Sequence, residues 1–438
     1  MYFFKKRWIF FTFFYCFFLK KNYIKIKKME KIKVLVVPSD TVGGVGFYRS
    51  IQPHVQLQEQ YNSEFDVTIS PDFDWANLEE VKKYNIINFH KGIYQDMVSF
   101  RKALAFCKEN GIVTIMDVDD NWDLHSKHPL YTSQKHYKMD VITRENLTLV
   151  DYVTTTTPIF ANKIKKFNKN VLIFPNAINP EDKRFQVNKE KSDKLRIGLI
   201  MGSSHEEDMK LLDGVVNKLP ADIKKKITFV LCGFDLRGTV RTINPQTGEV
   251  NSRNIEPLET VWYRYEKCLT DNYRICSPDY TKFLHMFIPE AQYPLIANEN
   301  YKRCWTKDIN NYYQHYKEID ILLVPLVNND FNNCKSQLKV IESAFSNTAV
   351  IASNTGPYTI DLVSAIEKGG TINENGNALL VDTNKNHKDW VKYITKCAND
   401  PQLVEMLKKN LQKDICVKYD LRNVTNTRAE FYKNILNK

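Results

Sequence analysis

The residues best suited to bind a phosphate group lie in the second half of the chain, between a buried-strand pattern and an amphipathic stretch. Lys335 and Ser336 precede the predicted helix Leu338–Phe345, for which Ser336 is a suitable N-cap. The free N–H groups and the positive end of a helix attract an anion, and Lys335 and Lys339 add full charges on one face. Glu342 lies two turns beyond Lys335 on the same stripe. This arrangement predicts a diphosphate cradle; the alternative is a capped surface helix with two solvated lysines.

A glycine-rich turn follows the first predicted strand. Gly44 and Gly46 belong to a GGVG run, and Arg49 follows three residues later. Glycines let the backbone approach a phosphate or a sugar closely, and the next helix offers a positive terminus. The spacing differs from the G-x-G-x-x-G of dinucleotide-binding folds, because Arg49 stands at the position of the third glycine. The turn is therefore either a ligand-binding loop or a plain tight turn.

Two polar residues end predicted strands in the first half of the chain. His90 follows the strand Asn85–Phe89, and Asp117 follows the strand Ile112–Met116. Ligands of open α/β sheets bind outside the carboxyl ends of the strands, so we predict that both residues lie at a catalytic edge. The alternative for His90 is a structural role, which is equally common for a single histidine.

An acidic loop continues from Asp117 through Asp119 and Asp120. Carboxylates are the ligands that hard cations prefer, so a metal site is one interpretation. A solvated acidic turn is another. We predict instead that Asp119 and Asp120 orient the hydroxyl groups of a bound substrate.

Alternating apolar runs and amphipathic stretches from Lys31 onward indicate a parallel α/β architecture. Two series of strands, separated by the charged linker Asn179–Lys194, predict two Rossmann-like domains. The first series comprises Lys33–Val37, Asp66–Ile69, Asn85–Phe89, Ile112–Met116, Tyr152–Thr155 and Val171–Phe174. The second comprises Arg196–Ile200, Ile227–Leu231, Ile319–Val324, Ala349–Ala352 and Leu379–Val381. Predicted helices are Phe47–Gln60, Met97–Glu109, Glu206–Lys218, Leu338–Phe345, His387–Ala398 and Pro401–Lys413.

The expected domains are residues 29–190 and residues 191–415, followed by a C-terminal helix at 416–438 that returns to the first domain. An insertion at 234–300 interrupts the second domain. Its aromatic residues suit stacking on a sugar ring, although such clusters more often form a local core. These residues, with two that follow directly, are Trp262, Tyr263, Tyr265, Tyr273, Tyr280, Tyr293, Tyr301 and Trp305.

The charge of the chain argues against a nucleic-acid partner. The net charge is +11, but residues 1–28 hold eight Lys and Arg and no acidic residue, which leaves +3 for the rest. A nearly neutral body lacks the basic surface that nucleic-acid binding requires. The 438 residues are 43% hydrophobic and 26% charged, which excludes wholesale disorder and fits two domains.

Residues 1–28 form a leader that matches no targeting class. The apolar segment Trp8–Leu19 is too short to span a membrane, and the leader lacks the small-residue cleavage site of a secretory signal. One interpretation is a basic, aromatic segment that contacts the inner face of the membrane. The other, which we favour, is a translation start at Met29, so that residues 1–28 are dispensable. Nine cysteines without a C-x-x-C pair fit reduced thiols in the cytoplasm better than a disulfide or zinc framework.

Three stretches, in this order, resemble the family-4 (group 1) glycosyltransferases of surface-polysaccharide type. The first, residues 150–180, contains FPNAIN, which is similar to the family's I-P-N-G-[IV]-[DN] turn with Ala177 in place of the glycine. The second, residues 196–212, resembles the strand and glycine turn that open the nucleotide-binding domain. Gly202 and Ser203 stand there, where many members hold the donor diphosphate with an Arg and a Lys.

The third stretch, residues 321–353, is the most informative. The family pattern here is E-x7-E; Glu342 occupies the second acidic position, but Cys334 occupies the first. The loop reads F-N-x-x-K-S-x-L-K, similar to a branch common in surface-polysaccharide loci. By this resemblance the carboxylate of Glu342 accepts hydrogen bonds from both ribose hydroxyls. The donor-binding residues would be Lys335, Ser336, Lys339, Glu342, Gly202 and Ser203.

The resemblance implies the GT-B fold, in which two Rossmann-like domains face each other across a cleft. It also implies a hexosyltransferase-type enzyme that moves a sugar from a nucleotide-diphosphate donor to a glycan or lipid-linked acceptor, with retention at the anomeric carbon. We expect no metal and no other cofactor, since GT-B enzymes do not generally need the cation that D-x-D transferases use. Two other functions stay open: a nucleotide-sugar epimerase on the same fold, and a non-catalytic GT-B module that binds nucleotide sugar or glycan.

Overall fold

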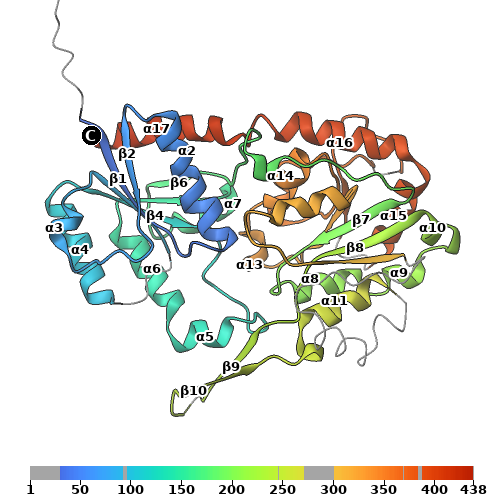
Figure 1. Ribbon diagram of the computed structural model, residues 1–438, viewed down its shortest axis with the longest axis horizontal. Coiled ribbons are helices and arrows are strands. Elements are labelled where there is room, and N and C mark those ends of the chain that lie inside the picture. The colour runs from blue at the N-terminus through green and yellow to red at the C-terminus, as the bar shows by residue number, and fades with distance from the viewer. Residues whose placement is uncertain are drawn as a thin grey trace, which may run out of the picture.

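Figure 1 shows a computed structural model of the chain, in which two α/β domains lie side by side. The structure describes residues 30–91, 96–244, 246–270, 300–367, 369–382 and 387–437. The predicted leader lies outside these residues, as do residues 271–299 of the insertion with Tyr273, Tyr280 and Tyr293. No helix in the described ranges has both the length and the apolar character needed to cross a membrane.

The first domain is built on a parallel sheet with the strand order β2-β1-β3-β4-β5-β6. Its central strands are continuous apolar runs, as expected for strands buried on both faces. The strands are β1 (Ile32–Val37), β2 (Phe65–Ile69), β3 (Ile86–His90), β4 (Val113–Val118), β5 (Tyr152–Thr155) and β6 (Val171–Ile173). The helices are the π-helix η1 (Gly46–Ile51), α2 (Gln52–Gln60), α3 (Leu78–Val81), α4 (Met97–Glu109), α5 (Tyr131–His136), α6 (Met139–Leu149) and α7 (Pro158–Ile164).

The second domain has a parallel sheet with the order β11-β8-β7-β12-β13-β14. Its strands are β7 (Leu195–Ile200), β8 (Ile227–Phe234), β11 (Tyr301–Trp305), β12 (Ile321–Val324), β13 (Ala349–Ser353) and β14 (Leu379–Val381). Its α-helices are α8 (Glu206–Met209), α9 (Val215–Lys218), α10 (Ala221–Lys226), α11 (Val261–Leu269), α13 (Asp330–Asn333), α14 (Leu338–Phe345), α15 (Lys388–Asn399) and α16 (Pro401–Ile415). Its 3-10 helices include η3 (Lys210–Leu212), η5 (Tyr312–Glu318) and η6 (Gly356–Ile360).

The C-terminal helix α17 (Leu421–Leu436) packs on the first domain. In Figure 1, α16 and α17 run along the same side of the molecule, one over each domain, and the chain ends beside β1. Tyr432 and Ile435 of α17 share a hydrophobic cluster with Val34 and Ile115 of the first sheet. The chain therefore crosses between the domains twice, once after β6 and once before α17.

The predicted helix Glu206–Lys218 is wrong as a single element. Helix α8 ends at Met209, η3 follows, and α9 begins only at Val215. Gly214 interrupts the series with a φ of 78°, a conformation that glycine adopts without steric cost.

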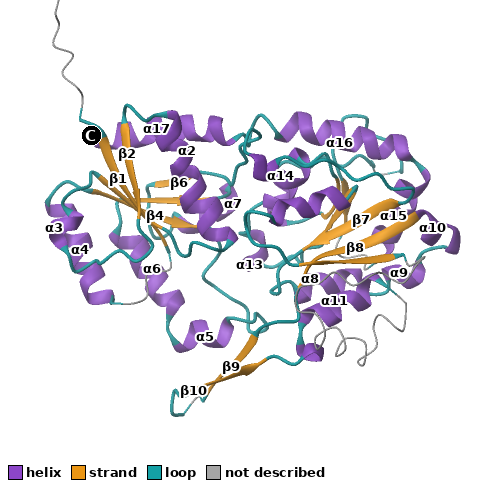
Figure 2. Ribbon diagram, in the orientation of Figure 1, coloured by secondary structure: helices purple, strands orange, loops and turns teal. Residues whose placement is uncertain are grey.

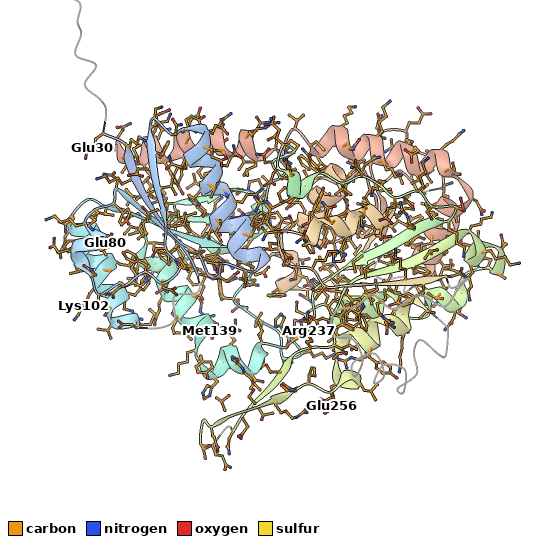
Figure 3. All side chains as sticks on the ribbon, in the orientation of Figure 1. Glu30, Glu80, Lys102, Met139, Arg237 and Glu256 are labelled. Atoms are coloured by element: carbon orange, nitrogen blue, oxygen red, sulfur yellow. The ribbon has the colours of Figure 1, made fainter. Side chains whose placement is uncertain are left out.

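The described part of the insertion forms a hairpin and a helix. Strands β9 (Thr239–Ile243) and β10 (Val250–Asn254) pair antiparallel and project away from both sheets (Figure 2). Figure 3 labels Arg237 and Glu256, which precede and follow this hairpin. Of the aromatic residues predicted here as a sugar-stacking platform or a local core, four are buried in the core of the second domain. These are Trp262, Tyr265, Tyr301 and Trp305.

Candidate active site

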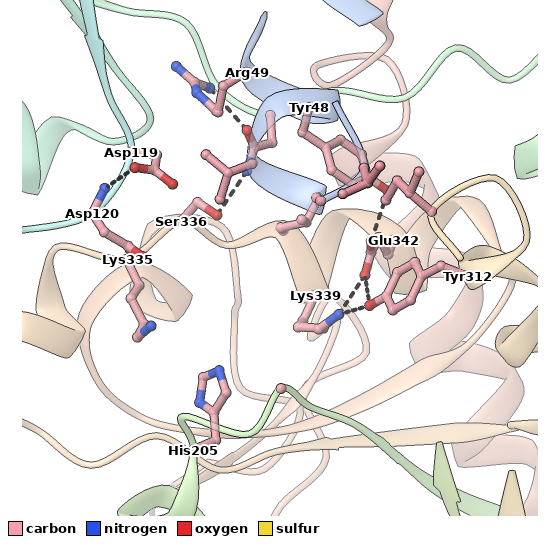
Figure 4. A pocket seen from close by; sticks show the side chains of 18 of the residues that line it. Tyr48, Arg49, Asp119, Asp120, His205, Tyr312, Lys335, Ser336, Lys339 and Glu342 are labelled. Carbon is pink, nitrogen blue, oxygen red and sulfur yellow. Dashed lines mark hydrogen bonds and ion pairs between the residues drawn. The ribbon is translucent and has the colours of Figure 1, made fainter. Parts of the chain in front are cut away.

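A cavity of about 550 Å³ lies between the two domains, where the loops after the carboxyl ends of both sheets meet (Figure 4). This is the position in which open α/β sheets bind ligands. The first domain lines it with Val42, Gly43, Gly44, Val45, Tyr48, Arg49, Asp119, Asp120 and Asn176. The second domain lines it with Gly202, His205, Lys307, Ile309, Tyr312, Lys335, Ser336, Leu338, Lys339, Glu342 and Tyr358.

Most of the site residues predicted from the sequence meet at this cavity. Those that line it are Gly44, Arg49, Asp119, Asp120, Gly202, Lys335, Ser336, Lys339 and Glu342. The cavity lining does not include Gly46, His90, Asp117 or Ser203.

Ser336 is not the N-cap that the sequence predicts. Helix α14 begins at Leu338 after Gln337, whose side chain makes no capping hydrogen bond. The Ser336 hydroxyl instead accepts a hydrogen bond of 3.0 Å from the side-chain amide of Asn176, and so joins the two domains. Lys335 extends past the ring of Phe331, with its ammonium 4.7 Å from the ring centroid. In Figure 4 its ammonium points toward the side of the cavity on which His205 lies.

Glu342 is fully buried and is held by four donors. Its Oε1 accepts from the phenol of Tyr48 at 2.9 Å. Its Oε2 accepts from Tyr316 at 2.9 Å, from Tyr312 at 3.3 Å and from the ammonium of Lys339 at 3.0 Å. Burial and the nearby carboxylate raise the pKa of the three tyrosines well above its usual value, so they stay protonated donors. A ribose hydroxyl that binds Glu342 must therefore replace one of these donors or join them.

Arg49 and Asp117 form a buried ion pair behind the cavity. Arg49 Nε lies 2.9 Å from Asp117 Oδ2 and Nη2 lies 2.7 Å from Oδ1, a bidentate geometry. Nη1 donates to the carbonyl of Phe174 at 2.7 Å and to Asn176 Oδ1 at 3.0 Å, while Thr154 donates to Asp117 at 2.6 Å. Burial alone would raise the pKa of Asp117, but the guanidinium outweighs it and lowers that pKa. Asp117 thus balances the charge of Arg49, and both of its oxygens are occupied.

His90 is buried and contacts the acidic loop. Its Nε2 lies 3.0 Å from Asp119 Oδ1, and the ammonium of Lys91 lies 2.6 Å from the same oxygen. Although burial opposes ionisation, Lys91 and His90 hold the pKa of Asp119 well below its usual value. Lys91 also donates to the backbone carbonyl of Asp120 at 3.1 Å, which fixes the loop. The loop therefore presents an ionised Asp119 to the cavity, and His90 contacts the cavity only through it.

The glycine turn wraps around a carboxylate of the protein itself. The backbone N–H groups of Val42 and Gly46 donate to Asp40 at 3.2 and 3.3 Å, and that of Gly43 donates to the same side chain. A Cβ on Gly46 would lie 1.9 Å from the Asp40 carbonyl oxygen, so only glycine fits there. Asp40 therefore occupies the N–H groups that the sequence suggested for a phosphate. Gly44, which has open space around it, is the glycine that remains accessible to a ligand.

His205 lines the cavity, although it was not among the predicted site residues. Its Nδ1 lies 2.7 Å from Asp208 Oδ2, and Asp208 also accepts from the N–H of Val327 at 2.8 Å and from Asn332 at 2.9 Å. Since the carboxylate can only accept, Nδ1 carries the proton and the neutral ring keeps its lone pair on Nε2. Burial lowers the pKa of His205, and Lys335 adds to this effect. The available signal was the H-x-x-D spacing, which places both side chains on one helical turn.

Solved structures with the same two-domain architecture are known, although comparisons of the sequence find no relative. No protein-family model matches the sequence, and neither does any curated protein. Among solved structures, HepE from Anabaena in complex with UDP and glucose superposes with a TM-score of 0.56 at 11% identity, over 92% of this chain and 100% of HepE. The chain has the GT-B fold.

Two further GT-B structures show the same likeness. A glycosyltransferase from Rickettsia africae ESF-5 has a TM-score of 0.54 at 12% identity, covering 93% of this chain and 99% of its own. Trehalose-6-phosphate synthase OtsA has a TM-score of 0.50 at 10% identity, covering 92% and 99%. The predicted fold is thereby confirmed, and the cavity described above occupies the space between the two GT-B domains.

Proposed function

We propose that the protein is a glycosyltransferase that moves a sugar from a nucleotide-diphosphate donor to a hydroxyl acceptor. The observation that carries this proposal is the distribution of charge in the interdomain cavity. The second domain contributes Lys307, Lys335 and Lys339 against the single carboxylate of Glu342, which pairs with Lys339. The first domain contributes the carboxylates of Asp119 and Asp120, and its one lining cation, Arg49, is balanced by Asp117. An excess of positive charge opposite an excess of negative charge suits a reaction that separates a diphosphate from a sugar and transfers that sugar to a hydroxyl group.

The donor binds, in this proposal, against the second domain. Lys335 and the neighbouring Ser336 take the diphosphate, and the positive charge of Lys335 offsets the charge that develops as the diphosphate leaves. HepE is crystallised in complex with UDP and glucose and with UDP-glucose, which supports a uridine nucleotide as the first donor to test. Glu342 stands at the back of this wall, where it would meet the ribose.

The acceptor, a glycan or a lipid-linked sugar, binds against the first domain. Asp119 is kept ionised by Lys91 and His90, so its carboxylate can accept a hydrogen bond from an acceptor hydroxyl. We propose that transfer retains the anomeric configuration and needs no divalent metal, because the lysines supply the positive field beside the diphosphate. His90 then acts as a positioning residue for Asp119.

A non-catalytic module that binds a nucleotide sugar is the second candidate. It is favoured by the residue at the first acidic position of the family motif, since Cys334 is a buried thiol packed in the core cluster of the first domain. A thiol in an apolar cluster cannot replace a carboxylate in a hydrogen-bonding role.

A thermal-shift series with UDP, GDP, CDP and ADP, followed by product analysis, tests the proposal. A ligand at one hundred times its Kd stabilises the folded state by about 2.7 kcal/mol, so the cognate nucleotide should raise Tm clearly above the others. Release of nucleoside diphosphate that depends on an acceptor identifies a transferase, and conversion of the sugar without release identifies an epimerase. Binding without turnover supports the module, and no shift with any nucleotide contradicts all three functions.

A further inference from the structure

Two cysteines and a histidine meet inside the second domain, outside the cavity lining. Cys232 of β8 and Cys304 of β11 are register partners on adjacent parallel strands, and His315 belongs to η5. Their two Sγ atoms and one imidazole nitrogen all lie within 4.8 Å of one another. The three residues are only 0%, 7% and 1% exposed, so this is an enclosed cluster. Seventy-one intervening residues separate the two cysteines in sequence, and no C-x-x-C pattern marks them.

The imidazole of the cluster has a nitrogen without a hydrogen-bond partner among the described residues. This nitrogen is Nε2 of His315, and it is buried. A buried nitrogen without a hydrogen-bond partner destabilises the fold, and coordination of a cation would remove that penalty. Imidazole and thiolate together are the ligands that zinc and other thiophilic cations prefer.

The surrounding charges also suit a divalent cation. Two thiolates and one neutral imidazole balance a charge of +2, so the loaded site adds no net charge to the protein interior. The adjacent residues Lys302 and Glu318 form an ion pair of 2.6 Å and neutralise each other. Other buried cysteines, such as Cys397, lie outside this cluster.

We propose that Cys232, Cys304 and His315 bind one thiophilic divalent cation, zinc in the first place, at a structural site. In a tetrahedral zinc site, Zn–S bonds of about 2.3 Å and Zn–N bonds of about 2.0 Å place the ligand atoms roughly 3.5–3.8 Å apart. Small side-chain movements reach that spacing from the observed one. As the two Zn–S bonds form, each thiol releases its proton to solvent.

A metal bound here would affect the interdomain cavity through helix η5. His315 stands in the same 3-10 helix as Tyr312 and Tyr316, whose phenols donate to Glu342. The rings of Tyr312 and His315 contact each other with centroids 6.1 Å apart. A cation that joins His315 to β8 and β11 fixes this helix on the sheet and thereby fixes the wall of the cavity. The site is independent of the proposed function, because it binds metal whether or not the chain transfers a sugar.

The test uses the full chain, purified in a reducing buffer without chelator. We expect about one zinc per chain by elemental analysis. Titration of the metal-free chain with Co²⁺ should produce a thiolate-to-cobalt charge-transfer band in the near ultraviolet. Cys232→Ser and Cys304→Ser should each abolish the band, and His315→Ala should weaken Co²⁺ binding by about tenfold or more. Cys397→Ser, which removes another buried thiol of the same domain, is the matched control and should leave the band unchanged.

The wild-type titration keeps the proposal testable even where the variants fail to fold. A reduced wild-type chain that is folded by circular dichroism, contains no zinc and gives no cobalt–thiolate band would overturn the site. A Cys232–Cys304 disulfide found by peptide mass spectrometry in freshly isolated protein would also overturn it. Because neither readout uses a nucleotide, failure of the metal site and failure of the transferase proposal are distinguishable.

Discussion

The phenolic oxygen of Tyr48 lies 2.9 Å from a carboxylate oxygen of Glu342, and this hydrogen bond joins the two domains. Tyr48 belongs to the π-helix η1 of the first domain, and Glu342 belongs to α14 of the second. A hydrogen bond within a folded protein contributes about 0.5–1.5 kcal/mol to its stability. The bond therefore stabilises the arrangement in which the cavity is closed on this side.

Tyr48→Phe should loosen the contact between the domains. The change removes the hydroxyl but keeps the ring, and we expect the free energy of unfolding to fall by about 1–2 kcal/mol. Tyr313→Phe is a matched control, since Tyr313 donates at 2.9 Å to the backbone carbonyl of Glu342 within one domain. Small-angle scattering should show a larger radius of gyration only for Tyr48→Phe. Equal radii for the two variants would contradict the role of Tyr48.

Lys335→Ala should weaken nucleotide binding and leave the fold intact. Loss of one ammonium beside a diphosphate should raise the Kd by about tenfold, or 1.4 kcal/mol, in calorimetry with UDP. Lys210→Ala is the control, because that lysine is exposed and paired with Glu207. An unchanged affinity in Lys335→Ala would remove this residue from the donor site.

Asp117→Asn should chiefly lower the free energy of unfolding, rather than act directly on turnover. The variant leaves the buried guanidinium of Arg49 without its counter-ion, which costs about 3–5 kcal/mol. Chemical denaturation measures this loss. A variant that keeps the wild-type free energy of unfolding but loses turnover would instead support the catalytic role predicted for Asp117 from its place at the end of β4.

Activity should persist when divalent cations are removed from the cavity. If the lysine field is sufficient, a chain treated with EDTA and then given back zinc alone, for the proposed structural site, should keep its rate nearly unchanged, and Asp119→Asn should raise the KM for the acceptor more than the Kd of the nucleotide. Asparagine has the same shape as aspartate, and its amide oxygen can still accept the hydrogen bond from Lys91. The variant therefore tests the effect of the negative charge alone. A rate abolished by EDTA and restored by manganese would contradict both expectations.

Acid should weaken the attachment of α17 through His54. Its Nδ1 donates to the carbonyl of Ser50 at 2.7 Å and its Nε2 accepts from the Tyr432 hydroxyl at 2.8 Å, an arrangement that requires the neutral ring. Burial, with a contribution from Arg428, lowers the pKa of His54 to about 3. Below pH 6.5 the unfolded chain binds a proton that the folded chain excludes, so stability falls as pH falls, by about 1.4 kcal/mol per pH unit.

The measurement compares free energies of unfolding at pH 7 and pH 5. His54→Gln does not titrate, so its loss over this range should be smaller than that of the wild type by about 2 kcal/mol. An identical loss in both proteins would show that other groups govern the acid sensitivity.

Most strands could be predicted from the sequence because burial on both faces favours runs that are largely apolar, as in β1 and β12. Strand β11 was missed because Lys302 and Arg303 stand in its centre. Their charges are balanced by Glu318 and Glu266, partners that only the folded chain brings near. The local sequence pattern thus predicts a strand whose own residues are apolar. It fails for a strand with charged residues whose partners are distant in the sequence.

The candidate site was predictable as a location but not as a set of contacts. Residues after the carboxyl ends of parallel strands meet by topology, which is why Lys335 and Asp119 line one cavity. The use of Asp40 to fill the glycine turn depends on side-chain geometry within the loop, which spacing does not encode. Likewise, no local signal connects Tyr48 with Glu342, whose pairing requires both domains.

The position of α17 has a consequence for how the protein is made. Chains are synthesised from the N-terminus, and the first sheet is complete once β6 has been translated. Yet Tyr432 and Ile435, which pack with Val34 and Ile115, are among the last residues to be added. The first domain is therefore completed only after the second domain has been synthesised. Until then, the apolar face that α17 covers stays exposed. During that interval the nascent first domain exposes an apolar surface that is prone to aggregation, and a chain truncated before Leu421 never covers it.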